Sequence, residues 1–149
     1  MRENNPYRED KEQMRELLKQ YENLKNGRSH SFLEEEAFET LIDYFLEKDD
    51  ITKAAEAAEI GCEHFPYSSL LLIKKADVLL ANRRYRDALE VLDQVSVLDA
   101  RDINIFILKT DAYLALDMHE KAVALLEEAV ASFEGEEKID LLVELAYVY

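Results

Sequence analysis

The sequence of 149 residues contains only three glycines, two prolines and one cysteine, and it has no tryptophan. Average usage would give about ten glycines and seven prolines in a chain of this length. Because β-strands are joined by turns that use these two residues, the shortage argues against a β-sandwich or a β-barrel. A single cysteine excludes an internal disulfide framework and is consistent with a reducing compartment.

The sequence also lacks a long apolar run and an excess of positive charge. No stretch approaches the roughly 18 apolar residues of a membrane span, and the N-terminal segment is too polar for a signal peptide. Thirty-three acidic residues against eighteen basic ones give a net charge of −15. Such a charge disfavours binding to nucleic acid or to an anionic membrane. We therefore expect a cytoplasmic protein with neither nucleic acid nor membrane as a partner.

Apolar residues recur every three or four positions through nearly the whole chain, which is typical of amphipathic helices. The breaks between these stripes carry helix-ending residues, namely Asn26-Gly27, Pro66 and Gly135. Candidate helix-starting residues are the capping boxes Ser31–Glu34 and Asp117–Glu120, and the single caps Asp50, Ser69 and Asp102. The pattern predicts helices over 7–25, 32–47, 51–64, 68–82, 85–98, 103–116, 119–133 and from 136 to the end. Connections this short make consecutive helices antiparallel.

A shift of about 34 residues superposes the landmarks of this pattern. The superposed columns are Ala54, Ala88 and Ala122; Phe38, Leu72 and Phe106; Phe45, Leu79, Tyr113 and Tyr147; and Asp43, Asp77 and Asp111. A column of alanines near the start of every second helix indicates a close crossing of two helices, where a larger side chain would push the axes apart. Large residues are expected to fill the space between paired helices, namely Phe38, Leu72 and Phe106, and Phe45, Leu79 and Tyr113.

These columns resemble the tetratricopeptide repeat, a family of repeated helical hairpins with this period. The matching units are 35–68, 69–102 and 103–136, followed by a half repeat at 137–149. The match is clearest in the second unit, at Leu72, Ala76, Leu79, Tyr85, Ala88, Leu92 and Asp99. The chain departs from the family where Phe38, Leu72 and Phe106 replace its tryptophan. The resemblance implies an all-α fold, a right-handed α-solenoid of antiparallel helical hairpins with about eight helices.

Residues 1–34 do not match the repeat. Their helix has one apolar stripe and balanced charges, so we expect a leading helix and linker that cover the exposed end of the first repeat. The alternative is the second helix of a decayed repeat.

Residue types that carry catalysis are scarce and scattered. His30, His64 and His119 have no second ligand at metal-binding spacing, and Cys62 lies two positions from His64 and so on a different helix face. No glycine-rich loop is present that could hold a phosphate. We therefore expect no enzymatic activity, no metal and no cofactor.

The resemblance implies that the first helices of the hairpins line a concave groove that binds peptides. The groove residues that it implies are Glu36, Glu39, Asp43, Glu47, Ile73, Asp77, Ile107 and Asp111. Their charge favours a basic segment of a partner. The alternative is that the aspartates form surface ion pairs with Lys74, Lys75 and Lys109, worth about 0–1 kcal/mol each. The family's use of Lys, Asn and Arg to hold a C-terminal carboxylate is not supported, because aspartate occupies the column where a donor is needed.

The sequence thus predicts a non-catalytic scaffold that binds a protein or peptide. The alternative is a structural or oligomerisation segment of a longer repeat array. The last helix carries more apolar residues than one buried stripe requires, namely Leu141, Leu142, Leu145, Val148 and Tyr149. We therefore expect the chain to be a fragment of a longer array that self-associates through this helix.

Overall fold

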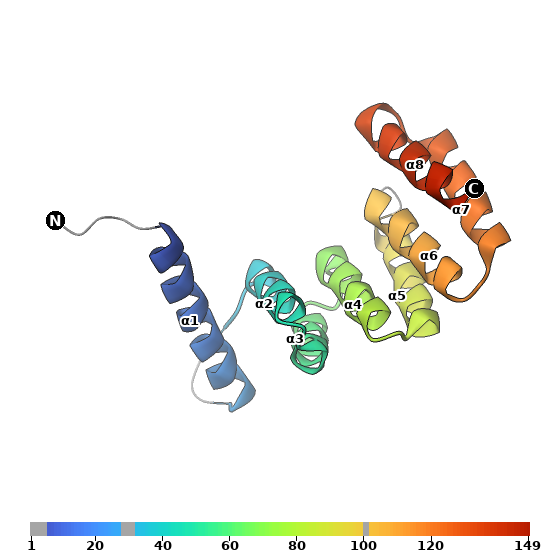
Figure 1. Ribbon diagram of the computed structural model, residues 1–149. Helices are drawn as coiled ribbons and strands as arrows, with labels where there is room; N and C mark the ends of the chain where they lie inside the picture. The colour runs from blue at the N-terminus through green and yellow to red at the C-terminus, as the bar shows by residue number, and fades with distance from the viewer. Residues whose placement is uncertain (1–5, 28–31, 100–101) are drawn as a thin grey trace.

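The computed structural model describes residues 6–27, 32–99 and 102–149, which form eight α-helices (Figure 1). These are α1 (Pro6–Lys25), α2 (Glu35–Glu47), α3 (Ile51–His64), α4 (Ser69–Ala81), α5 (Tyr85–Leu98), α6 (Ile103–Ala115), α7 (His119–Ser132) and α8 (Gly135–Val148). In Figure 1 they follow one another along an elongated array, with α1 at one end and α8 at the other. The predicted all-α solenoid is confirmed. Within the described ranges, no helix has the length and hydrophobicity to cross a membrane.

The helices pair as the hairpins α2/α3, α4/α5 and α6/α7, and each second helix also packs on the first helix of the next hairpin. The first helices α2, α4, α6 and α8 touch their neighbours in turn. Ala54, Ala88 and Ala122 are fully buried, as the close crossing of paired helices requires.

The turn inside each hairpin is the same structure in all three repeats. Asp49, Arg83 and Asp117 adopt a left-handed backbone conformation, with φ of 59°, 60° and 61°. The amide that follows each of them donates to a carbonyl near the helix end, on Phe45, Leu79 and Tyr113, at 2.8 Å in every case. This is the 6→1 bond of the Schellman motif, which satisfies carbonyls left free at the helix end. The backbone conformation of the turn therefore recurs with the same period as the packing of the helices.

The helix starts correct several sequence predictions. Asp50 and Asp102 cap α3 and α6 as expected, by accepting from the amides of Lys53 and Asn104. The cap of α4 is Ser68 rather than Ser69; its hydroxyl accepts from the Leu71 amide at 3.2 Å. The capping box at Asp117 is wrong, because Asp117 is the left-handed residue of the turn and Met118 precedes α7 without a side-chain cap.

Two further predictions of helix ends are wrong. The helix predicted from residue 32 begins at Glu35, after Glu34, which makes no side-chain cap bond. Ser31, the first residue of that predicted capping box, lies outside the described residues. Gly135 has the left-handed conformation predicted for it, with φ of 68°, but it is the first residue of α8 rather than the residue that ends α7 at Ser132.

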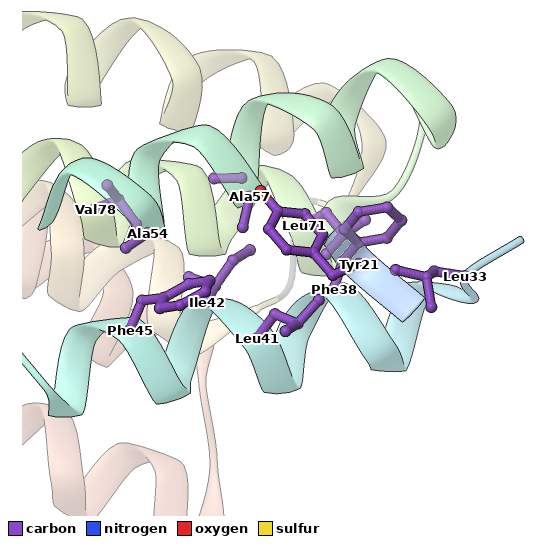
Figure 2. Close-up of a cluster of buried hydrophobic side chains, with 11 residues drawn as sticks. Tyr21, Leu33, Phe38, Leu41, Ile42, Phe45, Ala54, Ala57, Leu71 and Val78 are labelled. Carbon is purple, nitrogen blue, oxygen red and sulfur yellow. The ribbon is translucent and has the colours of Figure 1, made fainter. Parts of the chain in front are cut away.

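The first hairpin holds the largest buried cluster, centred on Phe38 (Figure 2). Phe38 is fully buried, and its ring meets Phe65 edge to face with centroids 6.2 Å apart. Gly61 makes room for this ring, since a β-carbon there would lie 3.1 Å from it. A phenylalanine in the tryptophan column is therefore matched by the absence of a side chain on the facing helix.

The leading helix α1 covers the first repeat through its C-terminal half. Tyr21 is 2% exposed and packs on Phe45, and its hydroxyl donates to Glu56 at 3.0 Å. Lys25 pairs with the same carboxylate at 2.6 Å. The end of α1 thus lies beside the end of α2 and the start of α3. A second helix of a hairpin would instead end beside the start of the next first helix, so α1 is not oriented like one.

The last helix is shifted by two positions from the repeat. Leu71 and Val78 of α4 and their repeat equivalents in α6, Ile105 and Ala112, are all buried. The same repeat would bury Ile139 and Ala146 in α8, but both are exposed.

Leu141 and Val148 are buried in their place, each two positions further along the chain. Tyr147, predicted to continue the column of Tyr113, is 85% exposed, and that prediction is wrong. Tyr149 takes the position of Tyr113 instead.

Candidate functional site

A hollow of about 390 Å³ lies on the side of the array formed by the first helices. Its lining comes from α2, α4 and α6 and from the residue that caps α6. The lining residues are Glu39, Ser69, Leu70, Ile73, Lys74, Asp77, Asp102, Asn104, Ile107 and Leu108. Because equivalent faces of three successive helices meet here, the hollow is a groove that runs across the repeats.

Four of the eight residues predicted from the sequence line this groove, namely Glu39, Ile73, Asp77 and Ile107. Asp43 lies at its edge, where it binds Lys74 of the lining at 2.7 Å. Asp111 is close enough to Asp77 and to Glu144 for their charges to act on it. Glu36 and Glu47 lie on α2 but do not line the hollow.

The three aspartates of the column meet three different neighbours on the following helix. Asp43 binds Lys74, and one repeat later the corresponding neighbour of Asp77 is Leu108, which has no charge. The shift of α8 then brings Glu144 to the equivalent place beside Asp111. The column is therefore neutralised by an ion pair in the first hairpin, only partly compensated by the more distant Lys74 in the second, and flanked by a like charge in the third.

These neighbours are reflected in the pKa values. Burial alone would lower the pKa of Lys74, but the hydrogen bond to Asp43 and the charge of Asp43 raise it. Burial raises the pKa of Asp77, and Lys74 offsets this only in part. The pKa of Asp111 is raised by desolvation and then by the negative charges of Glu144 and Asp77. Because both pKa values are raised, holding these carboxylates ionised costs the folded state free energy.

The predicted alternative of surface ion pairs holds for one aspartate of the column. Among the described residues, Asp77 and Asp111 have no ion-pair partner, and Lys109 binds Asp93 on α5 at 2.9 Å instead of Asp111. Lys75 lies outside the groove, in a second hollow of about 400 Å³ between α3, α4 and α5. That hollow carries both charge signs, with Arg84 facing Asp87.

Sequence reasoning missed three groove residues for which a signal existed. Leu70 and Asn104 occupy the same repeat position as Glu36, so the repeat that placed Glu36 on the groove face placed them there too. Lys74 entered only as an alternative partner of the aspartates, although it both lines the groove and cancels one of its charges. Leu141 is an apolar groove residue by the repeat, but it is fully buried because of the shift of α8.

The described cysteine and histidine side chains are not arranged for catalysis or metal binding. Cys62 is half-buried, and burial raises the pKa of its thiol, which disfavours the reactive thiolate. His64 packs against the ring of Phe38. The described part of the chain contains no group of three side chains placed to hold a metal ion.

Comparison with known proteins gives a consistent result for the fold. No family profile and no curated protein sequence matches the chain. Among solved structures, the second tetratricopeptide-repeat domain of human RPAP3, in complex with the HSP70 peptide SGPTIEEVD, superposes with a TM-score of 0.62 at 18% identity; the match covers 74% of this chain and 91% of that one. The first such domain of human RPAP3 has a TM-score of 0.64 at 14% identity, over 76% and 91%.

The tetratricopeptide-repeat domain of Arabidopsis OM64 is similar to the same degree, with a TM-score of 0.62 at 12% identity over 74% of this chain and 93% of that domain. Structural similarity at identities this low shows the fold alone, and all three neighbours share that fold. Together with the repeated turns and the buried alanine column, they show that this chain has the fold of a tetratricopeptide-repeat array.

Proposed function

We propose that the protein is a non-catalytic scaffold that binds a basic segment of another protein in the groove between α2, α4 and α6. The observation that carries this proposal is the pair Asp77 and Asp111, two carboxylates without a cation partner among the described residues. The positive charge of a lysine or arginine placed between them would offset both the cost of desolvation and the like-charge repulsion. Ile73 and Ile107 of the groove supply apolar contact for the rest of the segment.

The acidic residues of this groove do not suit the acidic peptide that one of the structural neighbours binds. The HSP70 peptide bound by the second RPAP3 domain, SGPTIEEVD, contains three acidic residues and no basic one. Asp77, Asp111 and Glu144 would repel such a peptide. The shared fold supports a peptide-binding role for this chain, whereas the side chains favour a ligand of the opposite sign.

A second candidate role is that of a structural or oligomerisation segment. The exposed apolar residues of α8, such as Leu142 and Val143, favour association of this kind, and self-association through α8 stays a prediction. So does the cytoplasmic location. A segment with a purely structural role would show no sequence preference for peptides, and this separates the two candidates.

The test is binding of an arrayed set of peptides with varied charge, followed by titration of the best one. We expect basic peptides to be selected, with binding that weakens as salt is added. The double variant Asp77→Asn and Asp111→Asn should weaken that binding by about tenfold or more, as expected for two charge-assisted contacts. Its control is Glu63→Gln with Glu128→Gln, which changes the net charge equally at exposed positions on the second helices α3 and α7.

Two outcomes would contradict the proposal. One is an affinity that the groove variant and the control variant reduce equally, since the attraction would then depend on net charge alone. The other is selection of acidic peptides or of none.

A further inference from the structure

The last helix leaves an unusually apolar face uncovered. Five large apolar side chains at this end of the chain are exposed: Ile139 (60%), Leu142 (45%), Val143 (51%), Tyr147 (85%) and Tyr149 (75%). They are half of the ten exposed large apolar residues in the described part of the chain. With Ala146 they form a continuous face opposite the buried Leu141 and Val148. Contiguous apolar surface of this kind marks an interaction site more often than isolated exposed residues do.

The shift of α8 identifies what this face is built to receive. With the shift included, Leu142, Ala146 and Tyr149 are the equivalents of Phe106, Thr110 and Tyr113 in α6. In α6 these positions pack on the second helix of the hairpin, because Phe106 meets Phe133 at the end of α7 and Tyr113 lies under Lys121 at its start. The part of the uncovered face formed by Leu142, Ala146 and Tyr149 is thus the surface on which a second helix sits in a complete hairpin.

The contacts of Tyr149 support the same assignment. Its hydroxyl donates to Glu127 of α7, and it lines a hollow with His119, Glu120 and Val123 of that helix. In the second repeat the equivalent residue, Leu79, lines the corresponding hollow beside Ala55, Ala58 and Glu59 of α3. There the other wall is α5, the second helix of the hairpin. At α8 that wall is absent from the described chain.

Carboxylates border this face on two sides. Glu136, Asp140 and Glu144 follow one another at every fourth position, beside Val143 and Tyr147 on the same helix. Glu120 and Glu127 of α7 lie on the other side, next to Tyr149. From His119 to Val148 the chain has eight acidic residues against two basic ones, Lys121 and Lys138.

We infer that α8 is a second, separate docking site, and that its occupant is an amphipathic helix of a partner with basic residues on both sides of its apolar stripe. Such a helix would complete a fourth hairpin and pair with the carboxylates at both borders. Two copies of α8 facing each other would bring acidic borders together, so a second copy of this chain is the disfavoured occupant. The site lies outside the groove proposed above and does not depend on it.

The test uses a second helix of the chain itself as the probe. One peptide has the α7 sequence, residues 119–132, and the other has the same sequence with Glu120→Lys, Glu127→Lys and Glu128→Lys. Both keep the same apolar stripe, so they differ in charge alone. We expect the lysine-substituted peptide to bind the full chain about tenfold or more tightly at low salt, as expected for three exposed ion pairs. Its binding should shift the NMR signals of amides in α8.

Variants of the chain then locate the site. Leu142→Glu and Ile139→Glu should each weaken binding of the lysine-substituted peptide at least tenfold, although each adds a negative charge that would attract it. Val97→Glu is the matched control, because Val97 is 87% exposed on α5, which does not contact α8, and it should leave binding unchanged. Asp77→Asn, the groove variant of this test, should preserve most of the binding, because Asp77 lines the groove between α2, α4 and α6. Circular dichroism checks that every variant remains folded.

Four results would overturn the inference: equal affinity for both peptides, no binding of either, loss of binding in the groove variant but not in Leu142→Glu, and self-association through α8 that excludes the peptides. The last result would assign the face to a second copy of the chain.

Discussion

The two ends of the array differ in the surface that their terminal helices leave exposed, although each of these helices covers the neighbouring hairpin. At the N-terminal end, α1 covers the first hairpin, and its Tyr21 and Lys25 share one carboxylate, Glu56. At the C-terminal end, α8 covers the third hairpin with Leu141 and Val148 but presents a new apolar face of its own. A repeat array needs terminal elements with a polar outer side. The first end has one among the described residues, and the second does not.

The comparison shows that a helix can cover the neighbouring repeat and still expose an apolar face of its own. α1 does not continue the repeat pattern, because its Tyr21 packs beside Phe45 near the end of α2, and its charges are balanced. α8 continues the array because it keeps the burial pattern of a first helix, shifted by two positions. The same shift places Glu144 beside Asp111, so the continuation also makes the nearby groove more acidic.

The largest expected effect is the difference in the free energy of unfolding between removing a buried tyrosine at the first end and an exposed tyrosine at the last. Tyr21→Ala should lower the free energy of unfolding by on the order of 3 kcal/mol, because the ring is buried between α1 and Phe45. Tyr147→Ala should change it by less than about 0.5 kcal/mol, since that ring faces solvent. Chemical denaturation measures both, and hydrogen exchange reports whether α1 detaches. Equal effects would mean that the two ends are equally covered.

The next effect compares one repeat position inside the array and at its end. Ala76 is fully buried, whereas Ala146, its equivalent in α8 once the two-position shift is included, is exposed. Ala76→Leu should cost about 1–3 kcal/mol by overpacking, and Ala146→Leu should cost less than about 0.5 kcal/mol. Denaturation midpoints provide the comparison. A large cost at Ala146 would show that its face is already covered in solution.

A smaller effect appears in the pH dependence, with opposite signs at the two ends. The hydrogen bond from Lys25 lowers the pKa of Glu56, so Glu56 stabilises the fold above its ordinary value of 4.5, and this is lost as the pH falls through its lowered pKa. Glu56→Gln should therefore be less stable than the parent at pH 7 and equal to it in acid.

The pKa of Asp111 is raised, so its ionised form costs stability above the raised value, and the cost vanishes below the ordinary value of 3.8. Asp111→Asn should be more stable than the parent at pH 7 and equal to it in acid below that ordinary value. Both differences should stay below about 1 kcal/mol, because these groups are near the surface. Thermal unfolding across pH 3–8 checks the signs, and a difference of the same sign for both variants would contradict the assignment.

The smallest effect concerns contact between copies of the chain. Self-association through α8 should be weak at low ionic strength and should increase with salt, because salt screens the acidic borders but not the apolar face. Sedimentation velocity at two salt concentrations measures this change, and Leu142→Glu should remove it. Association that decreases with salt would mean that opposite charges hold the copies together, and α8 would not be the contact.

The fold was largely readable from the sequence because its determinants are local and repeated. The alanine column, the large residues at Phe38 and Phe45 and the constant repeat period each reflect a contact between helices adjacent in the chain. The acidic character of the groove was readable for the same reason, since one helix face follows from helical periodicity. Four of the eight predicted groove residues line the hollow, and all of them lie in the repeats where the period holds.

Other features depended on tertiary structure because they are relations between helices. Lys74 beside Asp43 and Leu108 beside Asp77 occupy the same repeat position, so that difference lies in the sequence. The placement of Glu144 beside Asp111 depends instead on how α8 is rotated, which no single helix encodes. The rotation of α8 follows from packing Leu141 and Val148 against α6 and α7, and that packing prevailed over a pattern that favoured Tyr147. The sequence by itself determined an acidic array of helical hairpins. The tertiary structure decided which aspartate meets a like charge and which apolar face stays open, because both depend on the rotation of α8 that packing sets.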